Sequence, residues 1–328
     1  QVLVNAANQW PEHPAVYDDF GTLTFSGLYE EAEVLKQQLI SRGIGEGQAV
    51  GIMARNGRNF IVGIFAVLGT GACVMPMSHQ LKRDELDEQI KHAALHFILD
   101  DLSGIDPMGS TDLIALKNGQ IRVAVTTNPN IAFAPHVDNP AFMRFTSGTT
   151  GTAKGVIISH QSAIERIEGA NTSLNLGPDD TVIWVLPIAY HFVVSILLYV
   201  RYGAAIAITK DFLPQSIIES INRFNGTLLY ASPMQIRLMA RAEEKIAIPS
   251  MKNVISTSAA ISEDVCVEFY ETYGIPVSQA YGIIEIGLPI INFAKSKEFP
   301  NAVGYALQDY DVAILDDNNQ PVEDGESG

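Results

Sequence analysis

The chain has 328 residues, 47% hydrophobic and 18% charged, which is a globular composition with material for two packed subdomains. It carries 21 Lys and Arg against 37 Asp and Glu, a net charge of −16. A surface of that sign argues against nucleic acid and anionic membranes as partners, although backbone amides and local cations can still hold a nucleotide. The two cysteines, Cys73 and Cys266, are expected to be buried and reduced, which favours a cytoplasmic location.

Helical and strand-like patterns alternate through the first hundred residues. Leu28, Ala32, Leu35 and Leu39 have the spacing of one helix face. The apolar runs that follow predict strands at 49–54, 72–77 and 96–101, with helices at 59–69 and 82–94 between them. This β-α-β-α-β order predicts a parallel sheet with helices on its faces. Residues 111–125 are predicted to form a hairpin that turns at Asn118-Gly119.

The alternation resumes after a connector rich in Pro and Asn. Helices are predicted at 161–172, 192–201, 214–224, 233–243 and 262–273, and strands at 181–186, 204–209, 227–231 and 253–257. Residues 181–208 are almost continuously apolar, but Arg201 would be costly inside a bilayer, so we predict buried core and no membrane span. The residues after about 290 lose the helical period and are predicted to form short strands and turns.

A loop rich in glycine and hydroxyl side chains, FTSGTTGTAKGV, covers residues 145–156. Glycines let successive N–H groups turn toward one concavity, and hydroxyls and a lysine add donors, which suits phosphate. From composition alone, a flexible surface turn is an equal alternative. A P-loop is excluded because Ala153 precedes Lys154 and Gly155 follows it, and because the next residues, GVIIS, are typical of a strand.

The loop closely resembles the TSGTTGxPKG signature of the adenylate-forming superfamily, with Ala153 in the place of Pro. This superfamily contains acyl- and aryl-CoA synthetases, adenylation domains of nonribosomal peptide synthetases, and luciferases. LTFSGL (23–28) and VLGTGACVMPM (67–77) resemble further segments of the family. The resemblance implies that the loop holds the β- and γ-phosphates of ATP and that its residues Thr146 and Lys154 take part in catalysis. The loop residues are Thr146, Ser147, Gly148, Thr149, Thr150, Gly151 and Lys154.

Two later segments resemble the nucleotide-binding segments of the family. QAYGIIEIG (279–287) is similar to QxYGxTE, which implies that Gln279, Ala280, Tyr281 and Gly282 bind the nucleotide, with Tyr281 stacked on adenine. Glu285 is then expected to act in catalysis by binding Mg²⁺, a hard cation that prefers carboxylate oxygen. Taken alone, Tyr281 suits a core aromatic and Glu285 an exposed loop acid.

Two further features of these segments bear on the nucleotide. Ile284 stands where Thr is commonest in the family, so one neutral hydrogen bond to phosphate, worth about 0.5–1.5 kcal/mol, is lost. TSAAIS (257–262) resembles SGAAPLS, which implies that Ser258, Ala259 and Ala260 lie along the adenine and the acid.

The segment LPIAYHFVV (186–194) resembles the one that opens the helix beside the carboxylate pocket of the family. Tyr190 matches a gating residue, and His191 the position where amino-acid activators place Asp, so an α-amino acid is disfavoured. A slip of one residue would exchange these two roles, and His191 as a core residue is the alternative. The residues expected to bind the acid are Tyr190, His191, Phe192, Ser258, Gly282 and Ile283.

The resemblance implies an α/β fold of two αβαβα-type subdomains with largely parallel sheets, at about 1–140 and 141–290, and an incomplete β-barrel at about 291–328. It covers the family's large N-terminal domain, and we expect the small C-terminal domain with its lysine to lie outside this sequence. The function implied is activation of an acyl or aryl acid by ATP and Mg²⁺, then transfer to CoA or to the phosphopantetheine of an acyl or peptidyl carrier protein. The alternatives are a nucleotide- or acyl-adenylate-binding module without turnover, and an amino-acid adenylation domain with an atypical pocket.

Overall fold

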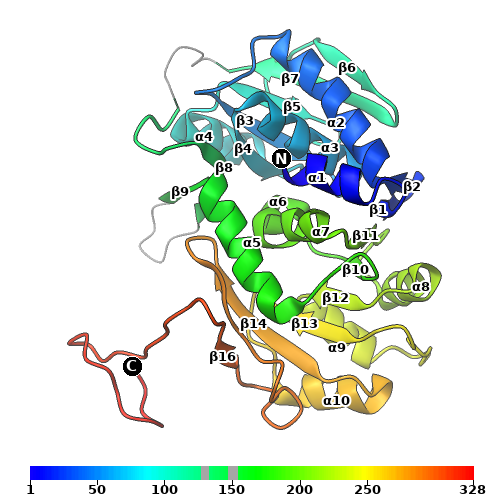
Figure 1. The fold of residues 1–328 in the computed structure, drawn as a ribbon, viewed down its shortest axis with the longest axis vertical. Helices are drawn as coiled ribbons and strands as arrows, with labels where there is room; N and C mark the ends of the chain where they lie inside the picture. The colour runs from blue at the N-terminus through cyan, green and yellow to red at the C-terminus, as the bar shows by residue number, and fades with distance from the viewer. Residues whose placement is uncertain (127–132, 147–153) are drawn as a thin grey trace.

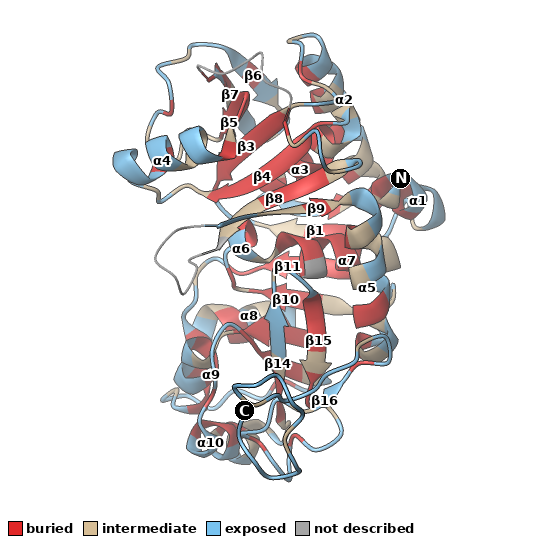
Figure 2. Ribbon diagram, turned by 90° about the vertical axis from the view of Figure 1, so that its left-hand side faces the viewer, coloured by how far each residue is buried: buried red, intermediate tan, exposed pale blue. Residues whose placement is uncertain are grey.

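Two β-sheets, one above the other in Figure 1, organise the molecule. The computed structural model describes residues 1–126, 133–146 and 154–328. One sheet has seven strands in the order β6-β7-β5-β3-β4-β8-β9, and the other has nine in the order β16-β15-β14-β13-β12-β10-β11-β1-β2. The central strands of each sheet are mostly buried, as Figure 2 shows, and the outermost helices are partly exposed.

The seven-stranded sheet contains the parallel unit expected near the N-terminus. This unit consists of the parallel strands β3 (Ala49–Ala54), β4 (Cys73–Ser78) and β5 (Phe97–Asp100), separated in the chain by α3 (Arg58–Thr70) and α4 (Arg83–Ala93). Side chains alternate between the faces of β3: Val50 and Ile52 join the core beneath α2 (Phe25–Ile40) and α3, and Met53 joins Leu86 of α4. Helices therefore cover both faces, as the sequence predicts.

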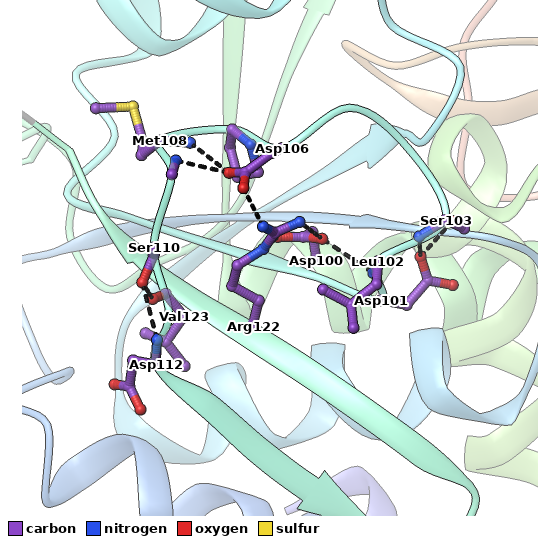
Figure 3. A network of polar contacts seen from close by, with 12 residues as sticks. Asp100, Asp101, Leu102, Ser103, Asp106, Met108, Ser110, Asp112, Arg122 and Val123 are labelled. Carbon is purple, nitrogen blue, oxygen red and sulfur yellow. Dashed lines mark hydrogen bonds and ion pairs between the residues drawn. The ribbon is translucent and has the colours of Figure 1, made fainter.

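The hairpin predicted at Asn118-Gly119 is confirmed as β6 (Leu113–Leu116) and β7 (Gly119–Val125), which close one edge of this sheet. Asp100 of β5 lies opposite Arg122 of β7 and pairs with it at 2.9 Å. Arg122 also contacts Asp106, which holds the loop after β5 against the hairpin (Figure 3). These contacts join the loop to the hairpin, so we interpret the network as structural.

The nine-stranded sheet is built on five parallel strands, β10 (Thr181–Trp184), β11 (Ala205–Ile208), β12 (Leu228–Ala231), β13 (Asn253–Ser256) and β14 (Val277–Ile283). The antiparallel strands β15 (Gly287–Ile291) and β16 (Tyr305–Ala306) extend it. One face packs on α8 (Pro214–Phe224), α9 (Pro233–Ala240) and α10 (Glu263–Tyr273). No closed barrel forms in the described part of the chain, where the residues after β16 contain one isolated bridge, between Leu315 and Pro321.

A central layer of helices lies between the two sheets and shares one core with both. It contains α1 (Val2–Gln9), α2, α3, α5 (His160–Leu174) and α7 (Leu197–Tyr202). The predicted helix at 192–201 is divided, because the chain forms α6 (Ile188–His191) and a π-helical turn (Phe192–Ile196) before α7. Within the described ranges, no helix is both long and apolar enough to span a bilayer.

Both cysteines are buried, as the sequence predicts. Burial raises the pKa of Cys73 to about 12 and that of Cys266 to about 11.

Each sheet takes a hairpin from a distant part of the chain. The hairpin of β1 (Pro14–Asp18) and β2 (Gly21–Thr24) joins the nine-stranded sheet because β1 pairs in parallel with β11. The hairpin of β8 (Pro140–Thr146) and β9 (Lys154–Ser159) joins the seven-stranded sheet through β4. A buried ion pair at 2.6 Å, between Arg58 of α3 and Asp18 of β1, ties the two units together. The division of the chain at about 140 and 290 stays a prediction.

Candidate active site

Three of the segments singled out in the sequence follow parallel strands of the nine-stranded sheet. Residues 187–192 follow β10, residues 257–260 follow β13, and residues 280–285 lie at the end of β14. The carboxyl ends of parallel strands meet at one edge of a sheet, which is where ligands bind in open α/β folds. The structure thus brings together segments that lie about 90 residues apart in the sequence.

The loop predicted to bind phosphate connects β8 and β9 as an antiparallel hairpin, with Thr146 opposite Lys154. Residues 147–153, which include the predicted Ser147, Gly148, Thr149, Thr150 and Gly151, lie outside the described residues. The strand predicted at GVIIS is confirmed as β9, and α5 begins only at His160, where the Ser159 hydroxyl caps the helix by accepting from the Ser162 N–H at 3.1 Å. Lys154 is exposed at the start of β9.

Arg144 of β8 connects the segments, although the sequence analysis did not single it out. It donates through Nη1 to the backbone oxygen of Tyr190, and its guanidinium carbon lies 4.9 Å from the centre of the Tyr190 ring. Burial lowers the pKa of Arg144, while the charges of Tyr190 and Glu285 raise it. The sequence did contain a signal for Arg144, because it lies two residues before Thr146 on a strand and every second side chain of a strand shares a face.

His191 is surrounded by aromatic rings of the nine-stranded sheet. Its ring centre lies 6.1 Å from that of Trp184 and 6.5 Å from that of Tyr230, both in edge-to-face geometry, and those two rings stack on each other. Burial and the nearby Arg144 charge lower the pKa of His191 to about 4, so the imidazole is neutral at pH 7. The indole nitrogen of Trp184 has no hydrogen-bond partner among the described residues.

Phe192 points away from these rings. Its ring centre lies 5.4 Å from that of Phe142 on β8 and 5.9 Å from that of Phe65 on α3, so it packs against the seven-stranded unit. Tyr190, in contrast, is 43% exposed. Of the three residues predicted to bind the acid in this segment, Tyr190 and His191 lie beside Arg144 and Phe192 lies in the core between the sheets.

The end of β14 presents the residues predicted to bind the nucleotide. Tyr281 is 48% exposed, which is high for an aromatic ring and suits a ligand-stacking role. A Cβ on Gly282 would lie 2.5 Å from the carbonyl oxygen of Gly287, so the close approach of β14 and β15 requires glycine. Ala280 pairs with Ile291 of β15, and Ile283 is exposed.

Two hydrogen-bonding side chains hold this region in place. Arg166 of α5 donates to the backbone oxygens of Ile284 and Glu285, which leaves the exposed Glu285 carboxylate free to point elsewhere. Gln279 is buried, donates to Pro300 O at 2.7 Å and accepts from Ile261 N at 3.4 Å. Gln279 therefore joins β14 to the turn after β13, which positions that turn.

The turn after β13 exposes Ser258, Ala259 and Ala260 to solvent. Ser258 has φ of +74°, a left-handed conformation that is uncommon for residues other than glycine. Just before it, the Thr257 hydroxyl lies 3.4 Å from the Tyr230 hydroxyl. This turn therefore adjoins the aromatic rings around His191, and the roles of its three residues stay a prediction.

The family described as "AMP-binding enzyme" matches residues 3–328 of the chain. The chain belongs to this family. It is therefore a member of the adenylate-forming superfamily, as the motifs at 145–156 and 279–287 indicate, and the α/β fold that the resemblance implies is confirmed.

Curated relatives carry several different activities in their names. The chain is 27% identical to a 2-succinylbenzoate–CoA ligase of Geobacillus sp. (strain WCH70), over 89% of this chain and 59% of that protein. It is 24% identical to a linear gramicidin synthase of Brevibacillus parabrevis and 22% identical to a naringenin synthase of Pestalotiopsis fici. The match to the gramicidin synthase covers 99% of this chain and 6% of that protein, and the match to the naringenin synthase covers 94% and 12%. The chain thus spans less than two thirds of the length of these relatives.

Solved structures have the same fold. Apo MatB of Rhodopseudomonas palustris superimposes with a TM-score of 0.84 at 21% identity, over 99% of this chain and 68% of that one. The O-succinylbenzoate coenzyme A synthetase MenE of Bacillus subtilis, in complex with AMP, gives a TM-score of 0.82 at 20% identity, over 99% and 85%.

Proposed function

We propose that this chain binds ATP and a carboxylic acid and joins them as an acyl-adenylate, and that the acid is acyl or aryl rather than α-amino. A thiol of CoA or of a carrier-protein phosphopantetheine then accepts the acyl group. The observation that carries the proposal is the position of Arg144, which contacts Tyr190 and whose charge acts on both His191 and Glu285. Segments assigned to the phosphates, the acid and the metal therefore meet around one side chain.

The residues at the end of β14 fit an adenine nucleotide. The exposed Tyr281 ring can stack on a base, and Gly282 leaves room for the backbone to approach it. Mg²⁺ usually binds through one or two carboxylates together with substrate phosphates. The exposed Glu285 offers one such carboxylate.

The charges near His191 support an acid without an α-ammonium group. Arg144 is a cation in this region, and His191 is neutral at pH 7, so an incoming ammonium would meet a like charge and no carboxylate of the kind that amino-acid activators provide. The stacked rings of Trp184 and Tyr230 favour an apolar or aromatic acid beside His191.

A matched pair of hydrolysis-resistant acyl-sulfamoyl-adenosines tests this proposal by calorimetry on the 328-residue chain. One analogue carries 3-phenylpropanoate and the other phenylalanine, so they differ only in the α-ammonium group. We expect the phenylpropanoyl analogue to bind at least about tenfold more tightly, because juxtaposed like charges are unfavourable. Tighter binding of the phenylalanyl analogue would overturn the choice of acid, and binding of neither would overturn acid activation itself.

Turnover separates a ligase from a binding module. Ile284 lacks the hydroxyl common in the family and Ala153 stands in the place of Pro, and both features favour a module without turnover. The resemblance implies a further lysine in a small C-terminal domain, so we would measure acid-dependent exchange of pyrophosphate into ATP on the longest natural polypeptide that carries this chain. Exchange that requires Mg²⁺ and is lost in Glu285→Gln supports the ligase. Binding of the analogue without any exchange supports the module.

A further inference from the structure

Arg144 is a half-buried cation that forms no ion pair within the described residues, although the charge of Glu285 raises its pKa. Two other arginines are paired differently: the buried Arg58 contacts Asp18, and the partly buried Arg122 contacts Asp100. Arg144 instead gives one donor, Nη1, to the backbone oxygen of Tyr190 and lies over the Tyr190 ring. Its Nε and Nη2, which form the edge that binds phosphate or carboxylate in two parallel hydrogen bonds, donate to no described residue.

The strand register relates Arg144 to Lys154, a residue that the sequence assigns to phosphate. Arg144 lies opposite Val156 of β9, and Val156 is two residues after Lys154. Opposite residues of an antiparallel pair share a face, as do alternate residues of one strand. Arg144 and Lys154 therefore occupy the same face of the β8–β9 hairpin, with Arg144 nearer to Tyr190 and His191.

We propose that Arg144 binds the phosphate of the adenine nucleotide that becomes joined to the acid. This inference rests on the proposed function and names a binding residue within that site. The family resemblance implies a hydroxyl donor to phosphate at position 284, which Ile284 lacks, and Arg144 would supply a donor in its place. A phosphate suits it better than the acid's carboxylate for a chemical reason. The carboxylate loses its charge when the adenylate forms, whereas the phosphate keeps a negative oxygen in ATP, in the adenylate and in AMP.

Calorimetry with AMP and with adenosine tests the inference, because the two probes differ only in the phosphate. The variants are Arg144→Met, which removes the charge at similar length, and Arg144→Lys, which keeps the charge but not the two-donor edge. Arg237→Met, at an exposed position on α9, is the matched control. We expect Arg144→Met to weaken AMP about 10- to 100-fold, the range for a hydrogen-bonded charge. The AMP affinity of Arg144→Lys should lie between those of Arg144→Met and the unaltered chain. The affinity for adenosine should change less than about twofold in every variant.

Three outcomes would overturn the inference while leaving the proposed function standing. Unchanged AMP affinity in Arg144→Met would show that no phosphate is bound there. An equal loss for AMP and adenosine would show that Arg144 only supports Tyr190. A loss confined to the acyl-sulfamoyl analogue would place Arg144 at the acid. If the unaltered chain bound neither AMP nor adenosine, the proposed function itself would fail. Arg144→Lys keeps the test valid should Arg144→Met not fold.

Discussion

Gly282 lies where β14 and β15 approach each other most closely, so Gly282→Ala is a direct probe of the nucleotide-binding segment. The added Cβ would lie 2.5 Å from Gly287 O, and 3.5 Å from both Gly287 C and Leu288 Cα. The first contact must lengthen by about 0.5 Å, and the obstacle is backbone that cannot rotate away as a side chain could. Overpacking of this kind typically costs about 1–3 kcal/mol.

For a cooperative chain of 328 residues, the unfolding entropy is about 0.7 kcal/mol per degree, so Gly282→Ala should lower Tm by about 1.5–4 °C. Differential scanning calorimetry measures this directly, and AMP titration of the same sample should show weaker binding because the Tyr281 backbone moves. Gly177→Ala is the control, since a Cβ there meets nothing within 4 Å. If Gly282→Ala matched Gly177→Ala in both Tm and AMP affinity, the account of this close approach would be refuted.

Four further predictions concern stability, each measured by urea unfolding. The pKa of His191 is about 4 in the folded chain and an ordinary 6.5 in the unfolded chain, so the unfolded chain binds the proton first as the pH falls. The free energy of unfolding should therefore decrease between pH 6.5 and pH 4, by at most about 3 kcal/mol. His191→Gln should reduce this loss. Ser195→Ala removes a buried hydroxyl that has no hydrogen-bond partner among the described residues, and it should stabilise by about 1 kcal/mol. The N-cap variant Ser159→Ala should destabilise by about 1 kcal/mol, so equal effects of the two serine changes would contradict this reasoning. Arg58→Met leaves Asp18 buried and unpaired and should cost about 3–5 kcal/mol, most of it recovered when Asp18→Leu is added.

Local patterns in the sequence predicted most of the elements. The helix at 214–224, with Pro214 at its first turn, is confirmed as α8. The Asn118-Gly119 turn and the alternation of β3, α3, β4, α4 and β5 are confirmed as well. Each of these depends on neighbours within a few residues, through apolar periodicity or turn geometry, so the sequence alone carries the information. The family motifs at 145–156 and 279–287 also identified the superfamily to which the chain belongs.

The pairing of distant segments was decided only by the tertiary structure. Val16 of β1 lies beside Ile206 of β11, and nothing local to residues 14–24 indicates that this hairpin joins the second sheet. The sequence also did not predict the π-helical turn after His191. Its apolar residues also suit an α-helix, whereas the contact of Phe192 with the ring of Phe142 on β8 is made only in the folded chain.

The candidate site divides in the same way. Tyr190, His191, Tyr281 and Glu285 could be named from the sequence because the family motifs contain them, although their binding roles stay predictions. Arg144 belongs to no motif that was recognised, and its importance appears only when β8 packs beside the start of α6 and its guanidinium meets Tyr190. The sequence gives the charges that a chain carries. The electrostatic field at one point depends on which of these charges lie close together in a poorly solvated region, and only the folded structure determines which charges do.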